Sequence, residues 1–187
     1  MIINSLIKYL TSFFVDKEMR FIYRNNLKGD IELFLKQLFW RNPDKKTKAC
    51  SIYKTEKNYK IITMYSVVLE DEPVFVLPLN VGVEKLHNTI FKAINASKFI
   101  STKQYNSKRY STKDYLNMLK EKSLNNLYKK STHCCIYLKN SVLEICPSKY
   151  SERYKCFEPD SERNLKIEYS KENELKITNE VVKILNN

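Results

Sequence analysis

The first part of the chain shows apolar residues at helical spacing. Apolar residues occupy positions 3, 6, 7, 10, 13 and 14, and a second apolar stripe over residues 31–40 follows Asp30, a favourable N-cap. A charged turn over residues 42–48 then marks a boundary, because strand-like runs begin directly after it. We therefore predict an N-terminal helical extension over residues 1–46, packed on a domain formed by residues 47–187.

The next stretch changes to the twofold period of strands. Residues 50–55 and 59–69 are rich in β-branched and aromatic residues, and Glu56-Lys57-Asn58 between them predicts a hairpin. A turn at Asp71-Glu72-Pro73 leads into a predicted strand over residues 74–79, where Pro78 indicates a strand end or a sheet edge. From Val83 to about Ser97 the period becomes 3.6, which predicts a helix.

The last third of the chain repeats this order. Residues 101–110 are predicted to form a loop, followed by one helix capped by Ser111 or Thr112 and reaching Leu127. A hairpin over 131–147, a loop through Phe157, a strand over 165–169 and a C-terminal helix complete the pattern. The apolar positions of that last helix have the same spacing as those of the helix that begins at Val83.

Together these elements predict an α/β fold of the α+β kind. We expect a single domain with a largely antiparallel sheet flanked by helices and built from two strand–turn–helix halves. Only two glycines, Gly29 and Gly82, occur in 187 residues. The chain therefore has neither a GxxxxGK[ST] nor a GxGxxG phosphate loop, and classes of nucleotide-binding fold that depend on them are excluded.

Charge changes the picture, because the net charge of +12 is unevenly distributed. Residues 101–130 hold eight Lys/Arg and two Asp/Glu, a net charge of +6, whereas residues 131–187 are neutral overall. A basic field favours an acidic partner, which leaves nucleic acid, a membrane surface and an acidic protein open, beside a purely solubilising lysine face.

Five cysteines without regular spacing, and the lack of a secretory signal pattern, indicate free thiols and a reducing cytoplasmic location. The N-terminal apolar stretch is too short to span a membrane, which takes about 20 apolar residues. We therefore predict no membrane span, and attachment to a membrane surface stays as an alternative to packing on the core.

The stretch Ser131–Pro147 resembles a metal site in composition, since it contains His133, Cys134, Cys135 and Cys146. Adjacent cysteines in a strand point to opposite faces and cannot share one metal ion. We therefore predict a hairpin with its turn at Lys139-Asn140-Ser141, no metal and no cofactor. A nucleophile pair of His133 with Cys134 or Cys135 is also disfavoured, because sequence neighbours in a strand rarely meet in the required geometry.

One catalytic pattern survives. Asp160, Glu174 and Lys176 follow the order of the PD-(D/E)xK nucleases, in which two carboxylates bind a divalent metal ion and the lysine positions water. That chemistry needs Glu174 and Lys176 on a strand, whereas residues 174–186 have helical spacing. A PD-(D/E)xK-like nuclease or a basic nucleic-acid-binding protein is therefore the alternative function, and no catalytic residue is assigned.

From about Ala49 to Leu185 the chain resembles the bacterial contact-dependent growth inhibition (CDI) immunity proteins. Family features include a helix that ends in Ser-Arg and a strand pair that ends in Ser-Pro-Ser. In this chain Cys146-Pro147-Ser148 occupies the place of Ser-Pro-Ser. His87 stands where the family helix usually has a glycine. The matching helix positions are Leu86, Ile90, Ala93, Ile94, Ser97 and Lys98.

The resemblance implies a cytoplasmic non-enzyme that binds and neutralises one cognate toxin C-terminal domain, with no nucleic acid as partner. It transfers no site residues, so the partner site is predicted from charge and residue type. The basic stretch combines arginine, which grips carboxylates, with tyrosine, which supplies contact area at low entropic cost. We expect Tyr105, Lys108, Arg109 and Tyr110 to contact an acidic patch, and strand addition at a sheet edge is the alternative.

Overall fold

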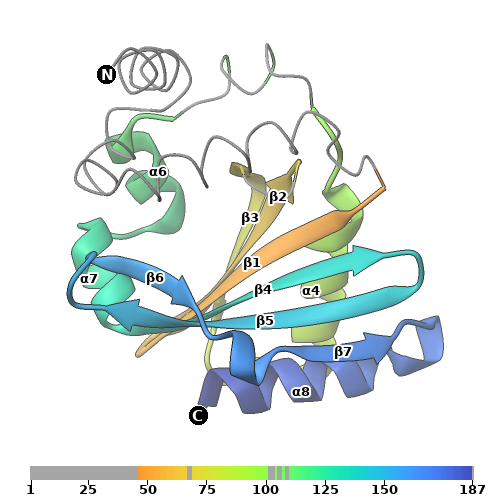
Figure 1. The fold of residues 1–187 in the computed structure, drawn as a ribbon. Helices are drawn as coiled ribbons and strands as arrows, with labels where there is room; N and C mark the ends of the chain where they lie inside the picture. Colours follow the sequence, from red (N-terminus) through yellow and green to blue (C-terminus); the bar gives the residue numbers. More distant parts are fainter. Residues whose placement is uncertain (1–45, 67–68, 101–103, 105–106, 108–109, 187) are drawn as a thin grey trace, which may run out of the picture. The chain divides into compact units, whose positions relative to one another are not determined.

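The structure, a computed structural model, describes residues 46–66, 69–100, 104, 107 and 110–186. Its centre is a seven-stranded antiparallel sheet in the order β3-β2-β1-β4-β5-β6, with β7 paired to β5 beside β6 (Figure 1). The strands are β1 (Lys48–Thr55), β2 (Asn58–Tyr65), β3 (Leu69–Pro78), β4 (Ser131–Lys139), β5 (Val142–Ser151), β6 (Cys156–Pro159) and β7 (Leu165–Glu168).

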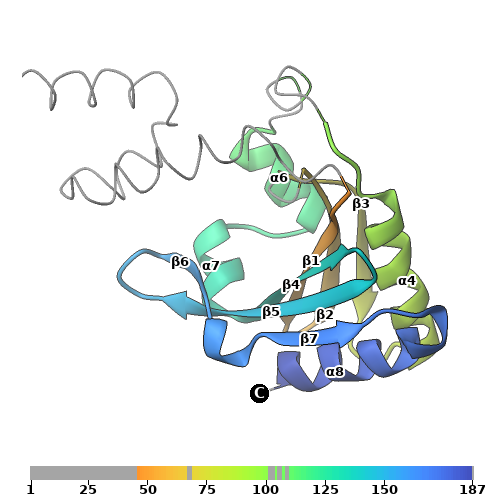
Figure 2. The same cartoon turned by 45° about the vertical axis from the view of Figure 1, so that its right-hand side comes forward.

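Helices cover both faces of this sheet (Figure 2). The first face carries the two longest, α4 (Val83–Ala96) and α8 (Glu174–Asn186), and the second face carries the short α6 (Thr112–Leu119) and α7 (Leu124–Lys129). Two 3-10 turns, η1 (Ser161–Arg163) and η2 (Lys171–Asn173), flank β7. The predicted α+β fold with a flanked antiparallel sheet is confirmed, and β3–α4 and β7–α8 are its two strand–turn–helix halves.

Both predicted hairpins are present, and side-chain chemistry explains their turns. At the end of β1 the hydroxyl of Thr55 accepts hydrogen bonds from the backbone N–H groups of Lys57 (3.2 Å) and Asn58 (3.1 Å), which closes the β1–β2 turn. Between β4 and β5, Asn140 and Ser141 both have positive φ, 47° and 61°. This is the two-residue turn that matches strand twist.

The predicted turn at Asp71–Pro73 is wrong, because these residues lie inside β3. The chain turns earlier, at Ser66, whose φ is 50°. The pairing of β2 with β3 shifts between Ile62 and Thr63, so that Glu72 and Pro73 form an irregularity in β3 outside the strand register. Their carbonyls accept hydrogen bonds from the hydroxyls of Tyr65 and Thr63 of β2 instead. A bulge at an edge strand accommodates a proline that a central strand could not. Pro78 does end β3, as predicted.

The main core lies between the sheet and α4 and α8. All four apolar positions predicted for the C-terminal helix pack there, as do those predicted for the helix at Val83. The buried Ser97 ends α4: its hydroxyl donates to the carbonyl of Met64 (2.5 Å) and accepts from the N–H of Ala49 (2.9 Å). The serine of the family-like helix ending thus joins α4 to β1 and β2.

Pro147 is buried within β5 at the point where that strand changes partners. On one side of β5, residues 142–145 pair with β7 and residues 148–151 pair with β6, which leaves Pro147 between the two ladders. A proline lacks the N–H that a ladder needs, so this gap is where it fits. Its carbonyl accepts a hydrogen bond from the N–H of Asp160 at 2.9 Å.

The region of α6 and α7 differs from the prediction. One helix was expected to reach Leu127, but α6 ends at Leu119, its C-cap Lys120 has a φ of 55°, and Ser123 caps a separate α7. Ser111 is the N-cap of α6, as expected. The loop predicted through Phe157 contains β6 instead. In the stretch predicted as a loop over 101–110, three residues are described: Gln104 and Ser107 are helical and Tyr110 is not.

The predicted helical extension over residues 1–46 lies outside the described residues, apart from Lys46, and stays a prediction. Within the described part of the chain, no helix is long and apolar enough to cross a membrane.

Candidate partner-binding surface

Tyr110 is the only described residue of the predicted contact set, since Tyr105, Lys108 and Arg109 lie outside the described residues. Its side chain is 39% exposed, and its hydroxyl donates to a carboxylate oxygen of the buried Asp71 at 2.6 Å. This hydrogen bond is the main reason why the pKa of Tyr110 lies above its ordinary value. The hydroxyl is committed to β3, so Tyr110 offers a partner its ring.

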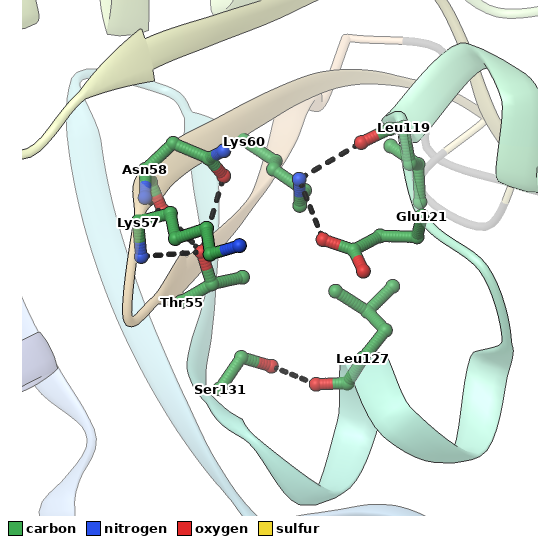
Figure 3. Close-up of polar contacts among 8 residues, drawn as sticks. All are labelled: Thr55, Lys57, Asn58, Lys60, Leu119, Glu121, Leu127 and Ser131. Atoms are coloured by element: carbon green, nitrogen blue, oxygen red, sulfur yellow. Dashed lines mark hydrogen bonds and ion pairs between the residues drawn. The ribbon is translucent and has the colours of Figure 1, made fainter.

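A buried lysine fixes the segment between α6 and α7 on the sheet (Figure 3). The fully buried Lys60 of β2 donates to the carbonyl of Leu119 at 2.8 Å, and its ammonium lies 2.8 Å from a carboxylate oxygen of Glu121. At the other end of α7, the hydroxyl of Ser131 donates to the carbonyl of Leu127 at 2.6 Å. A buried ammonium must be paired, so moving this segment away would leave Lys60 without partners.

A carboxylate on β3 holds α6 in the same way. Glu70 accepts a hydrogen bond from the hydroxyl of Tyr53 at 3.0 Å and another from the hydroxyl of Tyr115 in α6. Burial raises the pKa of the Glu70 carboxyl, and hydrogen bonds from Ser51, Tyr115 and Tyr53 partly oppose this shift. Around this cluster, Leu119 and Leu127 pack with Tyr53 and Ile62 of the sheet.

The outward side of this fixed helical pair is basic. Five exposed lysines form what we term the basic helical surface: Lys113, Lys120, Lys122, Lys129 and Lys130. Among the described residues, Lys129 is the only one of the five in an ion pair, with Glu152 at 3.0 Å. The acidic Glu121 of this segment faces Lys60 instead. The surface therefore presents mostly uncompensated positive charge on a rigid support.

The cysteine-rich hairpin is structural. As predicted, Cys134 and Cys135 lie on opposite faces of β4: Cys134 is in the main core, whereas Cys135 lies 3.8 Å from Nε2 of His133 on the second face. Burial raises the pKa of Cys135 to about 12 and lowers that of His133 to about 4. A protonated thiol beside a neutral imidazole is not an activated nucleophile pair.

The nuclease-like residues have structural partners as well. Glu174 is the first residue of α8, and its two carboxylate oxygens lie 2.9 Å from Nε2 of His87 and 2.7 Å from the hydroxyl of Tyr169. Asp160 lies 3.8 Å from the guanidinium of Arg163. Residues 174–186 are helical, as predicted. Over residues 46–66, 69–100, 104, 107 and 110–186, no three His, Cys, Asp or Glu side chains are placed to hold a metal ion.

Lys60 and Glu70 were not predicted from the sequence to support this surface. A lysine inside the apolar run of residues 59–65 was the available signal, because strand alternation puts its side chain on a covered face together with Ile62. The positive turn between β5 and β6 was not predicted either, because the charges of Arg153 and Lys155 are balanced by acidic residues elsewhere in residues 131–187.

Comparison with known proteins agrees with this architecture. A scan of protein families matches residues 48–176 to the family described as CDI immunity protein. Two solved structures share the fold at low identity. A protein of unknown function from Neisseria meningitidis is 17% identical, with a TM-score of 0.57, covering 75% of this chain and 94% of that chain. The CdiA-CT/CdiI toxin and immunity complex from Yersinia pseudotuberculosis contains a chain that is 12% identical, with a TM-score of 0.53, covering 75% and 96%.

No curated protein matches the chain. The family match nevertheless spans more than half of its length and includes the strands and helices of both strand–turn–helix halves up to the start of α8. The chain belongs to the CDI immunity protein family.

Proposed function

We propose that this protein is a cytoplasmic immunity protein that binds the C-terminal toxin domain of its cognate CDI system and neutralises it without catalysis. Membership of the CDI immunity family supports the partner class. The side chains that resembled catalytic sets in the sequence support the non-enzymatic part, because Glu174, His133 and Cys135 are engaged in contacts within the fold.

The observation that carries the binding mode is the basic helical surface on its rigid support. The contacts of Lys60 and Glu70 hold the segment that carries these lysines, so its backbone needs no reordering when an acidic partner is attracted and binds. The predicted contacts Tyr105, Lys108, Arg109 and Tyr110 directly precede α6. We propose that these four residues contact the partner together with the basic helical surface, and the exposed ring of Tyr110 is available for this contact.

Strand addition is the alternative binding mode. Both β3 and β7 are edge strands in the described sheet, and an incoming strand would use their backbone groups rather than lysines.

Charge reversal separates the two modes. The variant Lys108→Glu/Arg109→Glu is mixed with the C-terminal toxin domain of the cognate CDI system, and association is followed by stopped flow at several salt concentrations. We expect association about tenfold slower at low salt and a flatter salt dependence, because steering depends on opposite charges.

Lys85→Glu/Lys171→Glu is the matched control, since it makes the same change in net charge at two exposed positions on α4 and η2. If the Lys108/Arg109 variant associates and protects cells like the control, the basic stretch is not the site and strand addition at an edge becomes the better account.

A further inference from the structure

The turn between β5 and β6 lies against α7, although β4 and β5 separate the two in sequence. The hydroxyl of Tyr150 in β5 donates to the side-chain carbonyl of Asn125 at 3.1 Å. Glu152 in the turn pairs with Lys129 of α7 at 3.0 Å. Both views of the fold show this end of the β5–β6 hairpin next to α7 (Figures 1 and 2). The hairpin turn therefore continues the basic helical surface.

Aromatic packing makes this turn as well supported as the helices. Phe157 of β6 stacks on His133 with ring centres 4.7 Å apart and meets the edge of Tyr128 of α7 at 5.4 Å. Lys155 closes the turn with a φ of 55°, and its N–H donates to the carbonyl of Ser151 at 2.8 Å. The residues at its tip are thus presented in a fixed position.

The tip of the turn is positive, and its side chains Arg153 and Tyr154 form a pair suited to binding. Glu152 is the only carboxylate of the tip, and it forms ion pairs with both Lys129 and Lys155. Arg153 has no ion pair within the described part of the chain; its guanidinium lies 5.1 Å from the centre of the Tyr154 ring, which is 38% exposed. We term these residues the hairpin patch: Lys129, Lys130, Arg153, Tyr154 and Lys155.

We propose that the hairpin patch is a second contact site for the toxin domain, where Arg153 binds a carboxylate of an acidic face and Tyr154 supplies buried area. This inference rests on the proposed function. A guanidinium that is already oriented by a ring, with its donors free, fits the two oxygens of a carboxylate. Arginine and tyrosine are also the residue types that dominate the binding energy of protein interfaces.

An acidic protein fits this patch better than a nucleic acid does. A base would need an open aromatic face on which to stack, but the guanidinium of Arg153 already lies over the ring of Tyr154. Carboxylate and phosphate both fit the guanidinium, so the absence of an open stacking face for bases and the proposed toxin partner together favour Asp or Glu on a protein surface.

The test measures binding of full-length variants to the C-terminal toxin domain of the cognate CDI system, by surface plasmon resonance. We expect Arg153→Glu to weaken binding at least tenfold and Tyr154→Ala to speed dissociation several-fold. Arg153→Lys, which keeps the charge but loses the two-pronged geometry, should fall between Arg153→Glu and wild type. Lys85→Glu on α4 is the matched control for charge and should bind within twofold of wild type.

Each outcome has one meaning. If wild type binds the toxin domain but Arg153→Glu and Tyr154→Ala bind within twofold of it, with unchanged circular dichroism, the hairpin patch is not a contact and the proposed function stands. If wild type does not bind the toxin domain, both proposals fail. If wild type also binds a labelled 12-nucleotide RNA, and Arg153→Glu loses this RNA binding but keeps toxin binding, the patch serves nucleic acid and the inference is overturned.

Discussion

His133 shows how a single residue can be read as chemistry in the sequence and as packing in the fold. Its ring packs in a triangle with the rings of Tyr53 and Phe157, with centres 4.6 Å and 4.7 Å away, and Nε2 lies 2.9 Å from the hydroxyl of Ser51. Nδ1 is buried and has no hydrogen-bond partner. A protonated imidazole would be poorly solvated there, which is why burial lowers its pKa to about 4 from 6.5.

This shift predicts a loss of stability in acid. Between pH 6.5 and about pH 4 the unfolded chain binds a proton at His133 and the folded chain does not, so the free energy of unfolding falls as the pH falls. From about pH 7.5 to pH 4.5, wild type should lose about 2 to 3 kcal/mol more than His133→Phe, which keeps the aromatic packing but cannot titrate. Urea unfolding at both pH values measures the difference.

The comparison with His133→Phe isolates this residue from its neighbour Glu70. The raised pKa of Glu70 acts in the opposite sense, since its folded form holds a proton to higher pH and loses stability as the pH rises. Glu70 is present in both proteins, so its effect largely cancels. Equal pH dependence in the two proteins would show that His133 is not held neutral by burial.

At the scale of single residues, the sequence predicted which positions are apolar and inward but not which polar residues are buried with them. The alternation of Cys134 and Cys135 followed from strand geometry alone. By contrast, Lys60 is buried because a carbonyl and a carboxylate from residues 119 and 121 reach it. Partners that come from about 60 residues away leave no local signal in the sequence.

At the scale of elements, the break between α6 and α7 is the most instructive difference. Leu119 and Leu124 are five positions apart, which is out of phase with a continuous helical stripe. The left-handed residue that follows a helix is usually glycine. Here it is Lys120, so the sequence lacks the usual signal for a helix end. The missed β6 has a similar cause, because its four residues contain only one large apolar side chain, Phe157.

This break predicts a stabilising substitution. Lys120→Gly removes the steric penalty of a φ of 55° while keeping the N–H that donates to the carbonyls of Leu116 and Asn117. We expect the free energy of unfolding to rise by about 0.5 to 1 kcal/mol, measured by urea denaturation. Lys122→Gly loses the same charge at an exposed position that lacks positive φ and should give no gain. Equal effects of the two changes would argue against a left-handed Lys120.

At the scale of the whole molecule, the two strand–turn–helix halves were visible in the sequence, but the way they join was not. Strand β1 pairs with β2 on one side and with β4 on the other, which links residues 48–55 to residues 131–138. Hairpin pairing is local and predictable from turn residues. The β1–β4 pairing is set by the shared core under α4 and α8, which comes from the complete fold.

That joining also bears on the nuclease alternative, because it uses Glu174, one of the nuclease-like residues, to connect the halves. Glu174 joins α8 to His87 of α4 and to Tyr169 after β7, and Lys176 lies on the same helix. A carboxylate that is held by a tyrosine and a histidine is poorly placed to bind a catalytic metal ion together with Asp160. We therefore predict that the purified protein does not cleave plasmid DNA or RNA in the presence of Mg²⁺ or Mn²⁺.

Gel electrophoresis of plasmid and of total RNA, over a wide range of protein concentration, measures this directly. The comparison includes Asp160→Ala and Glu174→Gln, and Glu172→Gln is the matched control at an exposed position in η2. The protein would be a nuclease if wild type and Glu172→Gln cleave the substrate whereas Asp160→Ala and Glu174→Gln do not. Cleavage at the same level in all four proteins would instead come from a contaminating enzyme, because the residues required for the metal-dependent reaction would then be dispensable.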